Sequence, residues 1–531
     1  MLNRRAVLLA GPAVLGLLAS GCAAPTPAGG SGSDPRSMLL ADGYEPESLN
    51  PLLGYGLEGA SKFYDGLLAF DGRSELRPAL AAAPPRPSPD ARSWTVTLRE
   101  GVRFHDGTPF DAEDVVATYR AATDPAYAST VGSDYAMVER VSALDPRTVR
   151  FDLAYPYSAF PARMVLGIVP SEALAEPAPL AESPLNTRPV GTGPYELVEW
   201  RRGDQMTWRA NEDYWGGAPA IKDVTVAFAE DDNTRAQRLR SGEFDGTVLP
   251  PVLAESVGRD GYRTVYHETA DYRAIALPND HPVTGDPAVR EALNLAVNRQ
   301  GMIDALLGGH GTPAHTPIPG SMAEEHEPAA TFPFDPDRAA RILDEAGWRA
   351  GPDGVRQRGG QRAEFTVMYF ADDSLREDLA RAFASDAAAI GVHVELAGVD
   401  RAAVPARLDT DGIVLGGGNP VDADPQSYDS LHSSAIGTGT YNNPGKYRNA
   451  EVDAALDAAR RSTDPAERAA HYRTVQRAYV EDPGLVYLTF IDHAYVMREG
   501  VWDGYRPVVE PHTHGTTWGP WWNLQDWKPA A

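Results

Sequence analysis

Histidines and tryptophans gather near the C-terminus, in a stretch that could bind a ligand or a metal. His512 and His514 are one residue apart, and four of the chain's ten tryptophans follow, at positions 518, 521, 522 and 527. A His-x-His pair could ligate Ni or Zn, and aromatic rings with a polar edge suit the wall of a binding site. Two histidines do not complete a coordination shell, so a structural pair and core tryptophans are the alternatives. We predict ligand contacts at His512, His514 and Trp518, and no metal site or cofactor.

Patterns typical of enzymes are weak. The stretch 191–194 (GTGP) has the glycines of a phosphate cradle but lacks the Gly-Lys-Ser/Thr ending. The sequence contains no Gly-x-Ser-x-Gly nucleophile elbow and no His-Glu-x-x-His zinc helix. Paired carboxylates are too numerous in so acidic a chain to exclude a hydrolase. We expect no enzyme, and an exported hydrolase is kept as an alternative.

The only cysteine, Cys22, follows a segment that predicts export. Two arginines precede an apolar run at 6–18, and small residues at 19–21 end it, which is typical of a signal peptide. The run is shorter than the roughly 20 apolar residues that span a bilayer. A cysteine directly after the small residues resembles a bacterial lipobox, so we expect a lipoprotein signal peptide at 1–21 and a lipid on the Cys22 thiol. A plain secretory signal is the alternative, and either the Sec or the twin-arginine route remains open.

The remaining composition fits an exported body on a tether. Residues 22–36 are mainly Gly, Ser, Pro and Ala and predict a flexible tether. A single cysteine allows no internal disulfide, and no later run of 18 or more apolar residues predicts a transmembrane helix. The net charge of −26 argues against binding to nucleic acid or directly to anionic lipid. A chain of 531 residues is too long to fold around a single hydrophobic core, so we expect two or three lobes.

Helix and strand signals alternate along the chain, which predicts an α/β or α+β fold. Asp111 and Asp335 have the places of helix N-caps, and glycines at 347 and 391 should end two helices. We predict helices at 374–390, 450–461 and 464–480, two short strands within 93–104, and further strands at 148–154, 222–229, 363–370, 392–399 and 484–497.

Several short stretches follow one another in a specific order between about residues 40 and 505. They are 99–110 (REGVRFHDGTPF), 111–115 (DAEDV), 190–195 (VGTGPY), 211–217 (NEDYWGG), 289–299 (VREALNLAVNR), 345–348 (EAGW) and 449–453 (NAEVD). Any one of them is a weak signal, but the ordered set resembles family 5 of the extracytoplasmic solute-binding proteins. That family serves ABC importers for oligopeptides, dipeptides and nickel chelates.

The resemblance implies an α/β fold of the periplasmic-binding-protein-like type II (cluster C), with two lobes, an inserted third domain and a hinge between the lobes. Domain I would comprise 37–76, 191–275 and 500–531, domain II would be an insertion at 77–190, and domain III would span 276–499. Crossing segments near 274–280 and 496–503 would form the hinge, and the lobes would close on a solute.

The resemblance also implies partners and a location. The protein would be a monomer, lipid-anchored at the cell membrane on the extracytoplasmic face, that delivers its solute to an ABC permease and ATPase complex. A surface receptor that senses a ligand without transporting it is a further alternative.

The identity of the ligand stays open at this point. In peptide-binding members of the family, an aspartate three positions before an acidic-Pro pair holds the α-amino group of the peptide. Here the pair is Asp424-Pro425, Val421 has the place of that aspartate, and Asp422 is one residue off. Because a buried ammonium needs a charged partner, either Asp422 takes the role or the ligand has no free α-amino group. We predict contacts at Asn419, Asp422 and Asp424.

A peptide is expected first, and a nickel or other metal chelate is the alternative. The run 424–428 (DPQSY) is similar to that of the nickel-chelate members, although their chelate-holding arginine has only Arg163 nearby as a counterpart. Tyr55 is a further predicted ligand contact because glycines flank it in the first part of domain I, and core packing is its alternative.

Overall fold

The computed structural model describes residues 34–56, 58–258 and 260–531. The expected signal peptide (1–21), the lipidation site Cys22 and most of the tether (22–36) lie outside these residues. The fold described is that of the compact unit Pro35–Ala531. None of the described helices is both long and apolar enough to cross a membrane.

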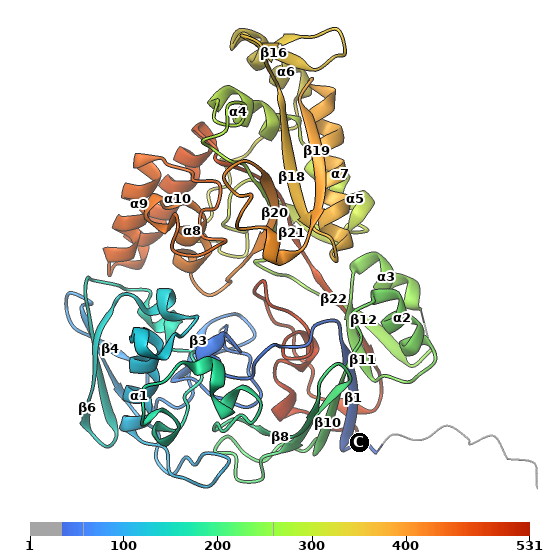
Figure 1. The fold of residues 1–531 in the computed structure, drawn as a ribbon. Coiled ribbons are helices and arrows are strands. Elements are labelled where there is room, and N and C mark those ends of the chain that lie inside the picture. Colours follow the sequence, from blue (N-terminus) through green and yellow to red (C-terminus); the bar gives the residue numbers. More distant parts are fainter. Residues whose placement is uncertain (1–33, 57, 259) are drawn as a thin grey trace, which may run out of the picture. The chain divides into compact units, whose positions relative to one another are not determined.

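A seven-stranded sheet is assembled from three distant stretches of the chain. Its order is β12, β22, β11, β1, β10, β9, β8, and β1 pairs in parallel with β10 and β11 while the other pairs are antiparallel. Helices α2 and α3 contact β11 (Figure 1). The bounds are β1 (Ser37–Asp42), β8 (Tyr195–Arg201), β9 (Gln205–Ala210), β10 (Asp223–Phe228), α2 (Asp232–Arg240), β11 (Gly246–Leu249), α3 (Pro251–Val257), β12 (Tyr262–His267) and β22 (His493–Arg498).

A six-stranded sheet with its own hydrophobic core follows in the sequence. Its order is β14, β21, β13, β20, β18, β19, and the residues of its core all lie between Tyr272 and Phe490. Helix α7 contacts β18, β19 and β20, and α4 contacts β21 (Figure 1). The bounds are β13 (Tyr272–Ala276), α4 (Pro287–Ala296), α5 (Arg299–Leu306), β14 (Gly311–Pro313), α6 (Pro336–Glu345), β18 (Glu364–Phe370), α7 (Ser374–Ala389), β19 (His393–Val399), β20 (Gly412–Gly417), α8 (Ala423–Leu431), α9 (Ala450–Arg461), α10 (Pro465–Glu481) and β21 (Leu485–Ile491).

An antiparallel four-stranded sheet in the order β4, β5, β7, β6 lies between β1 and β8 in the sequence, and α1 contacts β6 and β7. Its residue Trp94 belongs to the same hydrophobic core as Met38 and Trp208 of the seven-stranded sheet, so this sheet packs with the first one. The bounds are β4 (Arg86–Pro87), β5 (Ser93–Thr97), α1 (Ala112–Thr123), β6 (Val138–Asp145) and β7 (Thr148–Leu153).

The remaining elements are short. The strands are β2 (Leu68–Phe70), β3 (Leu76–Pro78), β15 (Arg349–Ala350), β16 (Arg356–Arg358), β17 (Gln361–Arg362), β23 (Trp502–Asp503) and β24 (Lys528–Pro529). The 3-10 helices are η1 (Pro51–Leu53), η2 (Pro125–Tyr127), η3 (Gly132–Tyr135), η4 (Phe160–Arg163), η5 (Ser171–Leu174), η6 (Leu180–Glu182), η7 (Pro184–Asn186), η8 (Arg401–Ala403), η9 (Ser433–Ala435), η10 (Gly519–Trp521) and η11 (Leu524–Asp526).

Helix boundaries follow the capping signals of the sequence. The Asp111 carboxylate accepts the Glu113 backbone N–H (2.8 Å), and Asp114 accepts the Asp111 N–H (2.9 Å), which closes a capping box at the start of α1. Asp335 caps α6 in a related way. Gly347 follows α6 with a φ of 86°, a conformation that glycine adopts without strain. These predicted ends are confirmed, and α7, α9 and α10 lie where the sequence predicts them.

Two strand predictions differ from the structure. The predicted strand 484–497 is two strands, because β21 ends at Ile491 while β22 begins at His493 and joins the other sheet. Both strands are almost entirely buried, and the polar residues Asp492 and His493 interrupt the apolar run for only two positions where the chain changes sheets. The second strand predicted within 93–104 is wrong, because turns with positive φ at Gly101 and Gly107 leave only a bridge between Arg103 and Pro109.

The chain crosses twice between the two larger sheets. One crossing runs from the end of β12 to the start of β13, through residues 268–271, and the other is at Asp492 between β21 and β22. Both lie N-terminal to the predicted segments 274–280 and 496–503. β13 therefore belongs to the six-stranded sheet and β22 to the seven-stranded sheet. The predicted domain III, 276–499, would instead leave most of β13 outside the six-stranded sheet's domain and include β22 in it.

Candidate ligand-binding site

A buried cluster of charged residues lies at these crossings. His493, the first residue of β22, has its Nε2 atom 3.1 Å from an Asp271 carboxylate oxygen and its Nδ1 atom 2.9 Å from a Glu510 oxygen. The three side chains are 4%, 0% and 0% exposed, respectively. Tyr495 donates its hydroxyl hydrogen to Glu510 at 2.6 Å. With a carboxylate at each ring nitrogen, His493 is held as an imidazolium that joins two acids.

The charged groups of this cluster shift one another's pKa values. Burial alone would lower the pKa of His493, but its hydrogen bonds to Asp271 and Glu510 outweigh burial and raise that pKa to about 9. Burial would raise the pKa of Glu510, but His267, whose Nδ1 atom lies 2.6 Å from a Glu510 oxygen, and the hydrogen bond with His493 lower it to about 2. The Asp271 pKa is also lowered against the effect of burial, chiefly by the adjacent Arg273 guanidinium. The cluster therefore stays ionised at neutral pH.

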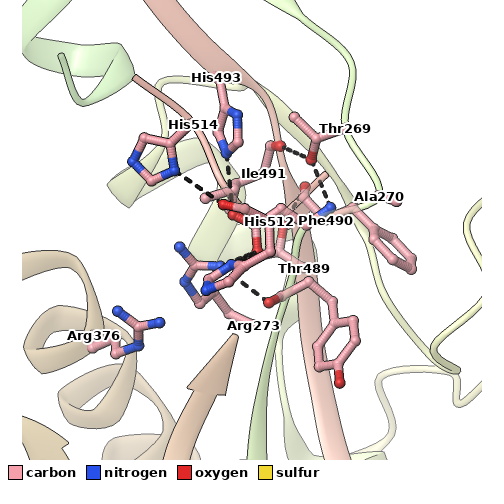
Figure 2. Close-up of polar contacts among 12 residues, drawn as sticks. Thr269, Ala270, Arg273, Arg376, Thr489, Phe490, Ile491, His493, His512 and His514 are labelled. Carbon is pink, nitrogen blue, oxygen red and sulfur yellow. Dashed lines mark hydrogen bonds and ion pairs between the residues drawn. The ribbon is translucent and has the colours of Figure 1, made fainter. Parts of the chain in front are cut away.

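Three residues of this region could together hold a metal ion. Asp271, His493 and His514 each offer one ligand atom, and these atoms lie within 4.8 Å of one another. The rings of His493 and His514 are 4.5 Å apart between centroids (Figure 2). A metal ligated by His493 would have to displace one of its carboxylate contacts together with a proton, since metal binds the neutral imidazole.

A cavity of about 210 Å³ adjoins the cluster through His512. The His512 Nδ1 atom lies 2.7 Å from Asp271, and the His512 side chain lines the cavity. Distant parts of the chain supply the polar lining, which comprises Glu58, Asp134 of η3, Arg163 of η4, Asn419, Asp429 of α8 and His512. Such convergence of polar groups on one cavity is typical of a ligand site. A larger hollow of about 490 Å³ along β8 is lined by none of these residues.

A buried ion pair lies next to the cavity on α8 and α9. Arg460 donates two hydrogen bonds to Asp424, from Nε at 2.8 Å and from Nη2 at 2.7 Å, and Asp424 is 0% exposed. The hydroxyl of Tyr157, which precedes η4, donates a third hydrogen bond to Asp424 at 2.8 Å. The Arg460 guanidinium also stacks 3.3 Å from the ring centroid of Tyr428. Asp424 is thus fully paired within the protein.

Comparison with known proteins identifies the family. The family model for bacterial extracellular solute-binding proteins, family 5 (Middle), matches residues 75–439. The chain belongs to this family. Protein XP55 of Streptomyces lividans is 47% identical over 499 residues, which cover 93% of this chain and 91% of that protein. The oligopeptide-binding protein AppA of Bacillus subtilis is 28% identical over 436 residues, covering 78% of each chain.

Solved structures of family 5 relatives have the same fold. NikZ from Campylobacter jejuni in complex with Ni(L-His) superposes with a TM-score of 0.83 at 26% identity, covering 93% of this chain and 99% of that one. AppA from B. subtilis in complex with a nonapeptide gives a TM-score of 0.81 at 25% identity, with the same coverage. The predicted family and the predicted α/β fold of type II periplasmic binding proteins are confirmed.

The predicted site residues of this family 5 protein are only partly brought together. Asn419 and His512 line the cavity. His514 is exposed, and its Nδ1–H donates to the His512 carbonyl oxygen at 3.1 Å. Asp422 caps α8 and pairs with Arg468 at 2.8 Å, so this carboxylate, like that of Asp424, already has a cationic partner.

The two predicted aromatic contacts pack within the protein. Tyr55 stacks on Phe63 with ring centroids 6.0 Å apart, and Trp518 is 4% exposed in a small cluster with Ala60 and Val508. Neither lines the cavity.

Sequence reasoning missed three acidic residues of the cavity. Glu58, Asp134 and Asp429 belong to no motif, and they are separated by long stretches of chain. The sequence places Arg163 only near the position of the chelate-holding arginine of the nickel-chelate members. In the structure it lines the cavity and pairs with Asp134 at 2.8 Å. Only the tertiary fold brings these four residues together.

Proposed function

We propose that this protein is the extracytoplasmic substrate-binding lipoprotein of an ABC importer, which captures a small solute, foremost a peptide, and delivers it to a membrane permease without breaking a bond. The observation that carries the proposal is the cavity, whose polar lining comes from η3, η4, α8 and the C-terminal segment of a family 5 fold. Asn419 and His512 are the predicted residues that we propose as direct ligand contacts.

The division into domains I, II and III with a hinge at the two crossings is part of this proposal. The separate core of the six-stranded sheet supports it, because two cores joined by two crossing segments can move as bodies about those segments.

A metal chelate is the second candidate ligand. The likeness to NikZ, which was solved with Ni(L-His), favours it, as does Arg163 at the cavity. The group formed by Asp271, His493 and His514 could supply protein ligands to an incoming metal. An exported hydrolase or a sensing receptor has no such specific support.

Binding should compact the protein in solution. Hinge closure brings two bodies together, so adding a saturating ligand should lower the radius of gyration in small-angle X-ray scattering. The probes are a dipeptide pool and, separately, the nickel–histidine chelate, and native mass spectrometry identifies which component is retained. Retention of a peptide supports the first candidate and retention of the chelate the second. An unchanged radius of gyration with a bound probe would contradict hinge closure.

Replacing Cys22 should release the protein from the membrane. If the Cys22 thiol carries the lipid, Cys22→Ala leaves no acyl chain to insert, and the protein should move from the membrane to the soluble fraction. Membrane fractionation followed by mass spectrometry of the N-terminal peptide measures both location and lipid. Ser20→Ala, which keeps a small residue before the cysteine, is the control. Full membrane retention of Cys22→Ala would show that another feature anchors the protein.

A further inference from the structure

A stack of two rings joins the two larger sheets next to one of the crossings. The imidazole of His310 lies on the ring of Tyr266, with 3.6 Å between the ring centroids and 4° between the ring planes. His310 immediately precedes β14, an edge strand of the six-stranded sheet, whereas Tyr266 belongs to β12, an edge strand of the seven-stranded sheet. The His310 Nε2 atom also lies 3.1 Å from a carboxylate oxygen of Glu255 on α3. The contact therefore joins the two bodies whose hinge motion is proposed above.

The backbone holds both rings of the stack in place. Tyr266 is paired with Ala494 of β22 in the seven-stranded sheet. The His310 N–H donates to the Leu307 carbonyl oxygen at 3.1 Å, and the His310 carbonyl oxygen accepts the Asp492 N–H at the crossing at 3.5 Å. Leu307 is itself fully buried. Each ring is thus fixed to its own body, so a motion of the bodies moves the rings against each other.

The stack and the cavity lie on opposite sides of the crossing strands. In the six-stranded sheet, β14 flanks β21 on one side, whereas β20, which ends at the cavity residue Gly417, lies on the other side beyond β13. In the seven-stranded sheet, β12 is the edge strand beside β22. Figure 1 shows α3 and β12 on one side of β22, and α8 and α9 on the other. A rotation about the crossings that widens the cavity side would therefore drive β12 and α3 toward His310.

The stack leaves no room for such an approach. Carbon atoms in contact are most favourably 3.5–4.0 Å apart, and the two rings are already 3.6 Å apart. A second contact limits α3, because a Cβ atom on Gly308 would lie 3.6 Å from Cγ2 of Val252. On the cavity side, Tyr157 and Asp424 are hydrogen-bonded in the same conformation. Opening the cavity would thus have to displace one ring of the stack from the other.

We propose that His310, Tyr266 and Glu255 form a stop that opposes opening of the cavity and thereby sets the affinity for the solute. The stop rests on the hinge of the proposed function, and it acts on the balance between the open and the closed conformation. None of its three residues lines the cavity. Because affinity falls with the population of the binding-competent closed conformation, easier opening weakens binding and harder opening strengthens it.

Spin labels on either side of the cavity measure the opening directly. The chain has a single cysteine, so a Cys22→Ala background with Leu144→Cys in β6 and Thr463→Cys between α9 and α10 carries labels only at these two exposed positions. In the ligand-free protein, His310→Ala should shift the distances from double electron–electron resonance to longer values, because the stop is removed. Val252→Phe, which adds bulk between α3 and the loop before β14, should shift them to shorter values.

Affinity should follow the opening. A dipeptide pool and the nickel–histidine chelate are titrated separately by calorimetry into the proteins without labels. The probe that the wild type binds should lose affinity about 5- to 10-fold in His310→Ala and gain a similar factor in Val252→Phe. Tyr266→Leu, which removes the stacked ring and keeps Glu255, should act as His310→Ala does. His393→Ala, at an exposed histidine of β19, is the control. A general loss of stability would not produce changes of opposite sign.

The outcomes separate the stop from the proposed function. Distances and affinities that are unchanged in His310→Ala and Val252→Phe, or that change in the same direction in both, would overturn the stop and leave the solute-binding function intact. A wild type that retains neither probe nor any other solute by native mass spectrometry would overturn the proposed function, and the label distances in the ligand-free variants would still decide whether the stop exists. A single distance that neither a bound probe nor any variant alters would overturn both the hinge and the stop.

Discussion

Replacing Arg460 by alanine should lower the free energy of unfolding by about 3–5 kcal/mol, because it leaves the Asp424 carboxylate buried with only the Tyr157 hydroxyl as a partner. The pair is stable as long as both members are present: the Arg460 charge holds the pKa of Asp424 below its ordinary value, against the effect of burial. Urea denaturation followed by tryptophan fluorescence measures the loss.

The neighbouring arginine on the same helix provides a matched control. Arg461 pairs with Asp457 at 3.2 Å, but its side chain is 57% exposed, so Arg461→Ala should cost less than about 1 kcal/mol. Both substitutions have the same effect on helix propensity, which isolates the contribution of the buried pair. The double variant Arg460→Ala/Asp424→Ala should recover part of the loss, since it removes the uncompensated charge. Similar losses for Arg460→Ala and Arg461→Ala would contradict this account of the pair.

Raising the pH from 6 to 10 should reduce the stabilisation that His493 provides by roughly 3 kcal/mol, calculated at 1.36 kcal/mol per pKa unit. The pKa of His493 is raised from 6.5 to about 9 in the folded protein. A raised pKa means that the folded state binds the proton more tightly than the unfolded state. The stabilisation is therefore complete below pH 6.5 and is lost as the pH rises through about 9.

A difference between two pH profiles isolates this effect. Lys62 acts in the opposite direction, because burial lowers its pKa to about 7 and its folded state therefore gains relative stability as the pH rises above 7. Subtracting the unfolding free energy of His493→Gln from that of the wild type at each pH removes the contribution of Lys62. The difference should decline between pH 6.5 and 10. His471→Gln, at a partly exposed histidine of α10, is the matched substitution control. Parallel wild-type and His493→Gln profiles would rule out the paired imidazolium.

Local signals of the sequence predicted helix ends well, whereas the site depended on contacts between distant residues. Asp111 and Asp335 act on backbone groups a few positions away, so their spacing alone identifies them as caps. Asp424 shows the opposite case. Its motif predicts a ligand contact, but its partner Arg460 is 36 positions away, and no local pattern predicts that the two residues pair. The sequence also could not predict that Asp429 and Glu58 line one cavity, because neither residue belongs to a recognisable motif in its own segment.

The crossings show a further limit of sequence reasoning. The stretch from β21 into β22 is mostly apolar, with Asp492 and His493 at the change of sheet, and both strands are buried, each in a different core. Periodicity reports that a residue is buried but not which sheet buries it. The resemblance to family 5 identified the fold.

The make-up of the Asp424 contact affects how much energy is needed to separate the segment of Tyr157 from helices α8 and α9, and so to release a bound solute. Both charged members, Asp424 and Arg460, lie on adjacent helices of the same core, whereas Tyr157 reaches them from the segment before η4. Separation of these segments would break the hydroxyl-to-carboxylate hydrogen bond of Tyr157, worth about 1.5–3 kcal/mol, and the bond from the Ser158 backbone N–H to the Arg460 carbonyl oxygen at 3.4 Å, and it would leave the ions paired. Opening would then leave no unpaired buried charge. A modest difference between the ligand's affinities for the open and the closed conformation would therefore be enough to reverse the populations of these two conformations.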